Sequence, residues 1–261
     1  MKPFVKAIIA GGCIIVTGLI ILIIALGLNG WTLIAHFSTE EFNDEQESNK
    51  IVVENFVGSV KINYYDGDTV QISYPVAKNY KFSISEENGV IRVKSPKPKW
   101  YEISIWWANI PQTVINLPKD TTFDLDLTVN AGSLRLGEGE YSKVKLTVNA
   151  GSLRATDIEC DTFNAEVNAG SMNISNITCH TSFEGEVNAG SLNAKYVTCP
   201  KITADVSAGS LNMTINGAKS EYNIVAHVSA GSSNIGSQPV VSDKSLIANV
   251  SAGSLNILFT S

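Results

Sequence analysis

Three cysteines at regular spacing are the residues best suited to metal or redox chemistry. Cys160, Cys179 and Cys199 are separated by 19 and 20 residues, and His180 follows the second of them. Three cysteines and one histidine are the donor set of a structural zinc site, whose sulfur ligands lie about 2.3 Å from the metal. Two of the cysteines could instead form a disulfide, which persists in exported proteins. The choice depends on how far apart the fold holds them.

Three acidic residues recur with the same rhythm. Glu166, Glu186 and Asp205 are 20 and 19 residues apart. Stacked carboxylates could bind a calcium ion or act as a general acid and base on a glycan. The alternative is a solvated acidic stripe, because no basic or aromatic residue nearby in the sequence frames a sugar subsite.

An aromatic cluster is the third candidate site. Trp100, Tyr101, Trp106 and Trp107 include three of the four tryptophans of the chain, and lysines precede them. Such a cluster could dock on lipid headgroups, stack on sugars or anchor a protein partner. It could also cap one end of the fold and cover its core. Both interpretations are open at this point.

A repeat centred on glycine determines the structural units that position these candidate residues. The motif Val-Asn/Ser-Ala-Gly-Ser occurs seven times, at spacings of 19, 19, 20, 19, 22 and 22 residues. The repeat glycines are Gly132, Gly151, Gly170, Gly190, Gly209, Gly231 and Gly253. A fixed period of this length is typical of repeat architectures in which each unit contacts its neighbours.

Each repeat alternates apolar and polar residues. Seven, five, three and one positions before the glycine the residue is apolar or small, with valine always at three and alanine always at one. This is the period of a strand with one buried face. In the Gly170 repeat the apolar positions then slip to Met172 and Ile174, and slip again to Ile177 and Cys179. With the change at the start of the next repeat, each repeat has three such slips. They predict three straight sides joined by corners, with glycine at a corner where a missing Cβ is useful.

We therefore predict an all-β protein, a parallel β-helix (β-solenoid) of 19–22-residue coils. Propeller blades need about 40 residues, and a β-sandwich does not require identical residues at a fixed step. Residues 121–261 form the regular solenoid with its seven Gly-Ser repeats. Residues 51–120 are strand-like but irregular and form an N-terminal cap, in which Asn88-Gly89 is a turn into another strand.

Stacked coils place equivalent residues in columns. With coils about 4.8 Å apart, the outer two cysteines lie about 9.6 Å apart, too far for one zinc ion. Neighbouring cysteines suit a disulfide, so either one disulfide or three packed thiols fill this inward column.

Asparagine occupies two further columns. Two residues before the glycine stand Asn130, Asn149, Asn168 and Asn188, and three residues after it stand Arg135, Arg154, Asn173, Asn193 and Asn212. Stacked amides can hydrogen-bond along the column. Such ladders either stabilise the stack or present a flat, neutral surface to glycans or another protein.

The N-terminus predicts a membrane anchor. Residues 7–28 are 22 residues without a charge, long enough for a helix to span a hydrocarbon core of about 30 Å. Lys2 and Lys6 place residues 1–6 in the cytoplasm, and the acidic residues that follow lie outside. Residues 29–50 are then a membrane-proximal tether. A cleaved signal peptide is the competing interpretation.

Charge excludes one class of partner. The 261 residues carry a net charge of −6 with only 17% charged residues, and a nucleic-acid-binding protein needs a basic surface. No cofactor motif occurs in the sequence, since the glycine repeat lacks a phosphate-loop lysine.

The anchor, the strands around Ile51–Ile62, the segment Val114-Ile-Asn-Leu-Pro-Lys and the glycine-centred repeats resemble a bacterial envelope family known as putative adhesins. The resemblance covers residues 50–261. It implies a membrane-attached, non-enzymatic surface protein, in some cases associated with envelope-stress systems, and it supplies no catalytic residues.

The function predicted is a non-catalytic, single-pass protein of the cell membrane whose extracytoplasmic solenoid presents an interaction or adhesion face. Its partners are the lipid bilayer and another envelope protein or a surface glycan. A sensor or accessory role in envelope-stress signalling is the alternative, and a polysaccharide-acting enzyme is the third. Because the chain stops at Leu255–Ser261 without a polar cap, we also expect self-association through an uncapped C-terminal coil.

Overall fold

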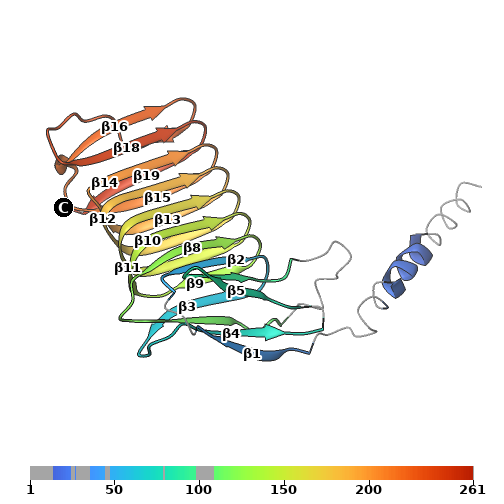
Figure 1. The fold of residues 1–261 in the computed structure, drawn as a ribbon. Helices are drawn as coiled ribbons and strands as arrows, with labels where there is room; N and C mark the ends of the chain where they lie inside the picture. The colour runs from blue at the N-terminus through green and yellow to red at the C-terminus, as the bar shows by residue number, and fades with distance from the viewer. Residues whose placement is uncertain are drawn as a thin grey trace, which may run out of the picture.

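The computed structural model describes residues 14–24, 27, 36–44, 48–78, 80–97 and 109–260. Its 19 strands form one continuous sheet that curls into a solenoid-like stack (Figure 1). Residues 14–24 are helical, and among the described residues no helix is long and apolar enough to cross a bilayer. Residues 1–6 and part of the predicted span 7–28 lie outside the described residues. The structure is thus mostly β and solenoid-like, as predicted.

Each coil has a side that leads to the repeat glycine and a side that follows it. The leading side consists of β2 (Lys50–Asn55), β6 (Val90–Lys94), β8 (Phe123–Val129), β10 (Gly139–Val148), the second halves of β11 (Ser152–Val167) and β12 (Ser171–Val187), β14 (Lys201–Val206), β16 (Tyr222–Val228) and β18 (Lys244–Val250). The following side consists of β3 (Ser59–Tyr65), β7 (Thr113–Pro118), β9 (Ser133–Leu136), the first halves of β11 and β12, β13 (Ser191–Thr198), β15 (Ser210–Asn216), β17 (Ser232–Ser233) and β19 (Ser254–Thr260).

Neighbouring coils pair in parallel and in register. Ser152 is opposite Ser171, Ser171 is opposite Ser191, and Ser191 is opposite Ser210. The antiparallel pairs lie at the N-terminal end, where β1 (Ser38–Asn43) pairs with β4 (Gln71–Val76), β4 with β7, and β5 (Ser83–Glu87) with β6. Asn88 and Gly89 join β5 to β6 with positive φ angles of 53° and 74°, which is the turn predicted there.

The inward columns are those that the alternation predicts, except at Val228, which is 45% exposed, and along the alanine column. Phe163, Ala165 and Val167 are buried before Gly170, and Met172 and Ile174 are buried after it. The alanine one residue before each repeat glycine is exposed, in every repeat. The strand ends at the valine, so the following Asn-Ala-Gly residues make the corner, and the alanine methyl points to solvent rather than into the core.

The repeat glycines are required by the close approach of neighbouring coils. A Cβ built on Gly170 would lie 2.3 Å from the carbonyl oxygen of Gly151 and 2.5 Å from Cγ1 of Val148. The other six repeat glycines have the same conflict with the carbonyl oxygen of the glycine in the adjacent coil, at 2.2–2.4 Å. None of the seven has a positive φ angle. Glycine therefore recurs along this corner because a Cβ has no space there, and not because the backbone conformation requires glycine.

The last coil of the chain is not the last coil of the stack. On the leading side β18 lies between β14 and β16, and on the following side β19 lies between β15 and β17. Figure 1 shows β16 beyond β18 at this end of the molecule. The expectation of an exposed C-terminal coil is therefore wrong. The chain first forms the outermost coil, with β16 and β17, and then returns to form the coil between it and β14 and β15.

Polar groups cover much of the exposed strand edge at this end of the stack. The backbone N–H and carbonyl of Ile224 in β16 both pair with the backbone of Gln238, at 2.9 Å each. The Ser237 hydroxyl bonds the N–H and carbonyl of Ala226. On the other side the Asn234 side chain pairs with the N–H and carbonyl of Ile257, both at 2.8 Å. Occupied edge groups are a common protection against strand addition, so part of this edge is closed, and self-association stays a prediction.

The N-terminal end repeats this arrangement. The first coil, β2 and β3, lies between the coil of β6 and β7 and the coil of β8 and β9. β1 then covers β4, so part of the region predicted as a tether, residues 29–50, is an edge strand instead. The sequence of β1, Ser-Thr-Glu-Glu-Phe-Asn, is polar because the strand is exposed on the edge, and polar edge strands resist further pairing.

The corner after the following side needs a left-handed backbone at one residue. Asp157, Asn176 and Tyr196 occupy this position in three successive coils, with φ angles of 59°, 55° and 59°. Asp and Asn tolerate this conformation, whereas it is strained for a bulky residue. The Asn176 amide also donates a 2.7 Å hydrogen bond to Asp157.

We expect Tyr196→Asn to be more stable than Tyr196→Ala by about 0.5–1 kcal/mol, because both variants lose the same ring but only asparagine suits the left-handed backbone. Urea unfolding of the two variants measures the difference. Equal midpoints would show that backbone strain at this corner is not a determinant of stability.

Candidate functional site

A ladder of asparagine side chains runs along the glycine corner. It consists of Asn130, Asn149, Asn168 and Asn188, which we call the corner ladder. Each amide nitrogen donates to the amide oxygen of the previous member, at 2.8, 2.9 and 2.9 Å. The members are half-buried, so these bonds are partly shielded from water. The corner ladder thus stabilises the stack, and most of its hydrogen-bonding capacity is used internally.

The acidic column is bonded to asparagine amides, two of which belong to the corner ladder. Glu166 and Glu186 are opposite each other in the sheet, and Glu186 is opposite Asp205. Glu166 accepts a 2.9 Å hydrogen bond from Asn168, Glu186 accepts one of 3.2 Å from its ladder neighbour, and Asp205 accepts one of 2.7 Å from Asn249. Among the described residues no group of His, Cys, Asp or Glu is arranged to hold a metal ion. The weak calcium candidate is therefore not supported by the geometry, since one oxygen of each carboxylate is bonded to an amide.

The three cysteines form the inward column expected of them. All are free thiols and all are buried. The Sγ atoms of Cys160 and Cys179 are 3.9 Å apart, and the Cys199 thiol donates to the carbonyl of Lys201 at 3.1 Å. Hydrogen bonds to the two neighbouring thiols, together with burial, raise the pKa of Cys179. His180 points outward and pairs with Glu159 at 3.0 Å, so it is no part of a zinc site.

A protonated thiol is a poor nucleophile and a poor metal ligand, which applies to Cys179. The hydrogen bond with Cys179 lowers the pKa of the Cys199 thiol instead. The sulfur separation exceeds the bond length of a disulfide, which is about 2.0 Å. The structure therefore holds the packed-thiol alternative.

The aromatic candidate cannot be placed. Trp100, Tyr101, Trp106 and Trp107 lie outside the described residues. The choice between a cap and a binding site stays a prediction from the sequence.

A second row lies on the outer surface of the following side, three residues after the glycine. Asn173, Asn193 and Asn212, which we call the side ladder, are in register, with amide-to-amide hydrogen bonds of 3.2 and 3.1 Å. Asn173 and Asn212 are exposed and Asn193 is half-buried. One N–H and one oxygen lone pair of each amide are not used within the side ladder and remain for a ligand.

The same row continues into positive charge. Arg154 is opposite Asn173 in the sheet, Arg135 is opposite Arg154, and Lys61 is opposite Arg135. We call Lys61, Arg135 and Arg154 the cation row. The four ion pairs formed by the described residues include none of its members.

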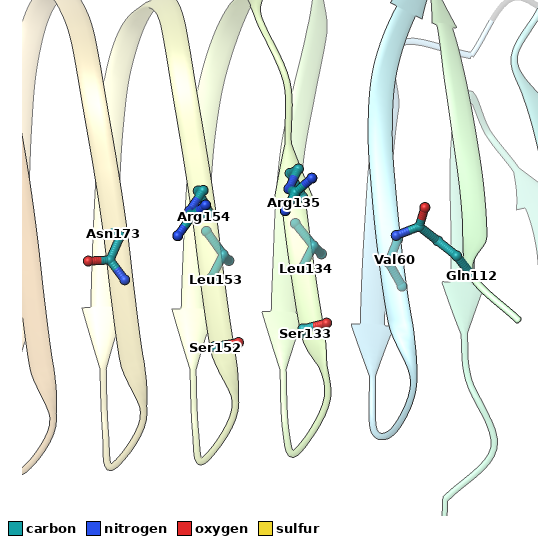
Figure 2. Close-up of a pocket in the computed structure, with 9 residues that line it drawn as sticks. All are labelled: Val60, Gln112, Ser133, Leu134, Arg135, Ser152, Leu153, Arg154 and Asn173. Carbon is teal, nitrogen blue, oxygen red and sulfur yellow. The ribbon is translucent and has the colours of Figure 1, made fainter. Parts of the chain in front are cut away.

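A groove lies along the two arginines of the cation row, and Lys61 is not among the residues that line it. Its volume is about 250 Å³. Its walls are Val60, Gln112, Ser133, Leu134, Arg135, Ser152, Leu153, Arg154 and Asn173 (Figure 2). In Figure 2 the two arginines lie at the same height on neighbouring strands, with the two serines nearer the glycine corner. The groove therefore combines two guanidinium groups with hydroxyl and amide donors.

Sequence reasoning missed Lys61 as a member of this row. The signal was present, because Gly58-Ser-Val-Lys-Ile repeats the Gly-Ser-Leu-Arg pattern of the later coils. The irregular sequence before Gly58 hid that the first coil lies next to the coil of Gly132. Only the pairing of β3 with β9 brings Lys61 beside Arg135.

Fold and site together define a β-repeat protein with polar ladders along a curled sheet. The sequence profile of the Toastrack family, DUF4097, matches residues 48–235, which is more than half of the chain. The chain therefore belongs to this family.

Solved structures similar to this chain have low sequence identity to it. A cell adhesion protein from Clostridium sporogenes, described as putative, is 15% identical, covers 86% of this chain and 100% of its own, and has a TM-score of 0.33. A putative adhesin from Bacteroides fragilis is 13% identical, covers 85% and 97%, and has a TM-score of 0.42. A putative adhesin from Parabacteroides distasonis is 10% identical over 85% and 97%, with a TM-score of 0.39. No curated protein matches the sequence.

Proposed function

We propose that this chain is a non-catalytic, membrane-anchored surface protein whose parallel β-helix presents an interaction face. The observation that carries the proposal is the outer row of the following side, in which amides and cations are held in register on a stack of paired strands. Such a surface binds through many weak, repeated contacts.

Chemical groups elsewhere on the stack support a binding role over a catalytic one. The Cys179 thiol has a raised pKa, and each acidic side chain of the column from Glu166 to Asp205 is bonded to an amide. Catalysis by carboxylates requires one protonated and one free group at a set separation. The described acidic column is a row of like groups with like partners.

The helix at residues 14–24 supports the anchor. Its sequence is Ile-Ile-Val-Thr-Gly-Leu-Ile-Ile-Leu-Ile-Ile, and every one of these residues is exposed. A helix that is apolar all round is stable only when something apolar surrounds it, and a lipid bilayer meets that need. Lys2 and Lys6 before the helix favour an orientation in which the β-helix lies outside the cytoplasm.

Fractionation of bacteria that express the full chain tests this proposal. We expect the protein to sediment with membranes, to resist extraction by high salt, to dissolve in detergent and to be cleaved by protease added to spheroplasts. Leu19→Asp combined with Ile23→Asp is expected to release it from the membrane, while Val241→Asp, also at an exposed apolar side chain, is not. Protein of shortened length in the medium would show a cleaved signal peptide instead, and resistance to external protease would overturn the proposed location.

A further inference from the structure

The cation row is a concentration of positive charge on an acidic protein. Lys61, Arg135 and Arg154 stand side by side on three parallel strands, about 4.8 Å apart, while the chain as a whole carries −6. Like charges directly opposite each other in a sheet are destabilising. The three coils that follow place a neutral asparagine at this position, so the fold does not require the charges.

Among the described residues, the surroundings of the row supply hydrogen-bond donors and no counter-charge. Two residues before and after each cation, on the same face of the strand, stand Ser59 and Asn63, Ser133 and Gly137, and Ser152 and Thr156. Within the described part of the chain no carboxylate lies within 4.0 Å of these cations. The groove of Figure 2 is therefore suited to an external anion.

The length of the row indicates an extended ligand. Lys61 and Arg154 are two strand spacings apart, about 9.6 Å, so one sulfate, phosphate or carboxylate group cannot contact all three cations. A chain carrying several such groups can, and each arginine can bind one of them through two parallel hydrogen bonds. Beyond Arg154 the same line continues into the side ladder, whose free amide groups suit hydroxyls.

We infer that the cation row and the side ladder bind an acidic glycan that lies along the stack, across the strands. Acid groups of the glycan contact Lys61, Arg135 and Arg154, and its hydroxyls contact Asn173 and Asn193. This inference rests on the proposed function, because it names the ligand class of the interaction face.

A bilayer surface fits the row less well. Proteins that bind the interface insert apolar or aromatic side chains beside their basic residues. Among the described residues the exposed large hydrophobic side chains of the β-helix are Tyr196, Val225, Val228, Val241, Ile247 and Leu258, and none belongs to β3, β9 or the first half of β11.

Binding of the full chain, kept in solution with a non-ionic detergent, tests the inference. The probes are dextran sulfate and polygalacturonate, with neutral dextran as the uncharged glycan. The variant Arg135→Asn/Arg154→Asn gives two coils the residue that the next coils already have. The control Lys143→Asn/Lys145→Asn removes two exposed charges from β10 on the leading side.

We expect the first variant to bind the acidic glycans at least tenfold more weakly and the control to change binding less than twofold. The salt dependence of the affinity should also fall in the first variant alone, because fewer ion contacts are made. Its melting temperature should stay equal or rise, since a like-charge contact is removed. A loss of binding with an unchanged fold is the supporting result.

Three outcomes would overturn the inference. These are equal loss in both double variants, equal affinity of the wild type for neutral dextran, and no binding of either acidic glycan. Mixed micelles that contain phosphatidylglycerol serve as the lipid probe. If Arg135→Asn/Arg154→Asn loses binding to these micelles but still binds dextran sulfate, the row binds a membrane surface and not a glycan. The fractionation experiment tests the membrane-anchored surface location and does not depend on glycan binding. Failure of the glycan inference can therefore be distinguished from failure of the proposed function.

Discussion

Gly170→Ala is expected to lower the free energy of unfolding by about 3 kcal/mol or more, because overpacking against backbone cannot be relieved by a side-chain rotation. The new Cβ would lie 2.3 Å from the Gly151 carbonyl oxygen and 2.5 Å from a methyl of Val148. Two coils would have to separate at this corner, which also breaks the hydrogen bond from Ser171 N–H to the Gly151 carbonyl. Chemical unfolding followed by circular dichroism measures the loss.

Two other glycines provide matched controls. Gly236 has no atom within 4 Å of its ideal Cβ, and Gly236→Ala should change stability by no more than about 0.5 kcal/mol. Gly185 lies in the core, where a Cβ would be 3.2 Å from side-chain atoms of Leu192 and Phe183. The coils on either side carry alanine at its position, so Gly185→Ala should be tolerated far better than Gly170→Ala. Similar losses in all three variants would show that close coil approach is not the reason for the glycine column.

The sequence predicted which residues share a column. Identical residues at a fixed step place Gly132, Gly151 and Gly170 on one line, and the structure confirms the line. The alternation also placed the valine three before the glycine correctly in six of the seven repeats, the exception being the exposed Val228. It failed at the next alanine, because period-two counting assumes that the strand continues to the glycine. The corner begins two residues earlier, where the asparagine amides bond to one another.

The order of the coils was not predictable from the repeat. Each repeat offers the same column residues, so β16 and β18 are equally suitable neighbours for β14. The spacing of 22 residues for the last two repeats, instead of 19 or 20, was the available signal of a longer connection. That signal indicates extra residues but not the direction in which they carry the chain.

The same limit applied to the outer row. Arg135, Arg154 and Asn173 were placed in one column from their distance to the glycine. Lys61 joins them only because the first coil lies beside the coil of Gly132, which is a long-range pairing. The absence of acidic partners in the described structure could not be judged from sequence, since it depends on what the neighbouring strands place on that face.

Deleting residues 244–261 is expected to unfold the C-terminal part of the stack. The deleted coil buries Leu246, Ala248, Val250, Leu255 and Ile257, which are 0–4% exposed. At about 1.5 kcal/mol or more for each of the four larger side chains, the loss is on the order of 6 kcal/mol, comparable with the whole stability of many domains. The deletion also removes both strands that hold β16 and β17 to the stack. Limited proteolysis should then cut first within residues 217–243.

Hydrogen exchange of the intact chain tests the same arrangement without removing anything. In a stack that follows chain order, the last strand is the edge and exchanges fastest, because end units open with the least free energy. Here β18 is paired on both sides, by β14 and β16, whereas β16 has a strand on one side and a short cover at Ile224 and Ala226 on the other. Amides of Leu246–Val250 should therefore exchange at least tenfold more slowly than those of Val225–Val228. Faster exchange in β18 than in β16 would contradict the insertion of the last coil, and with it the reason that the chain end does not act as an open edge.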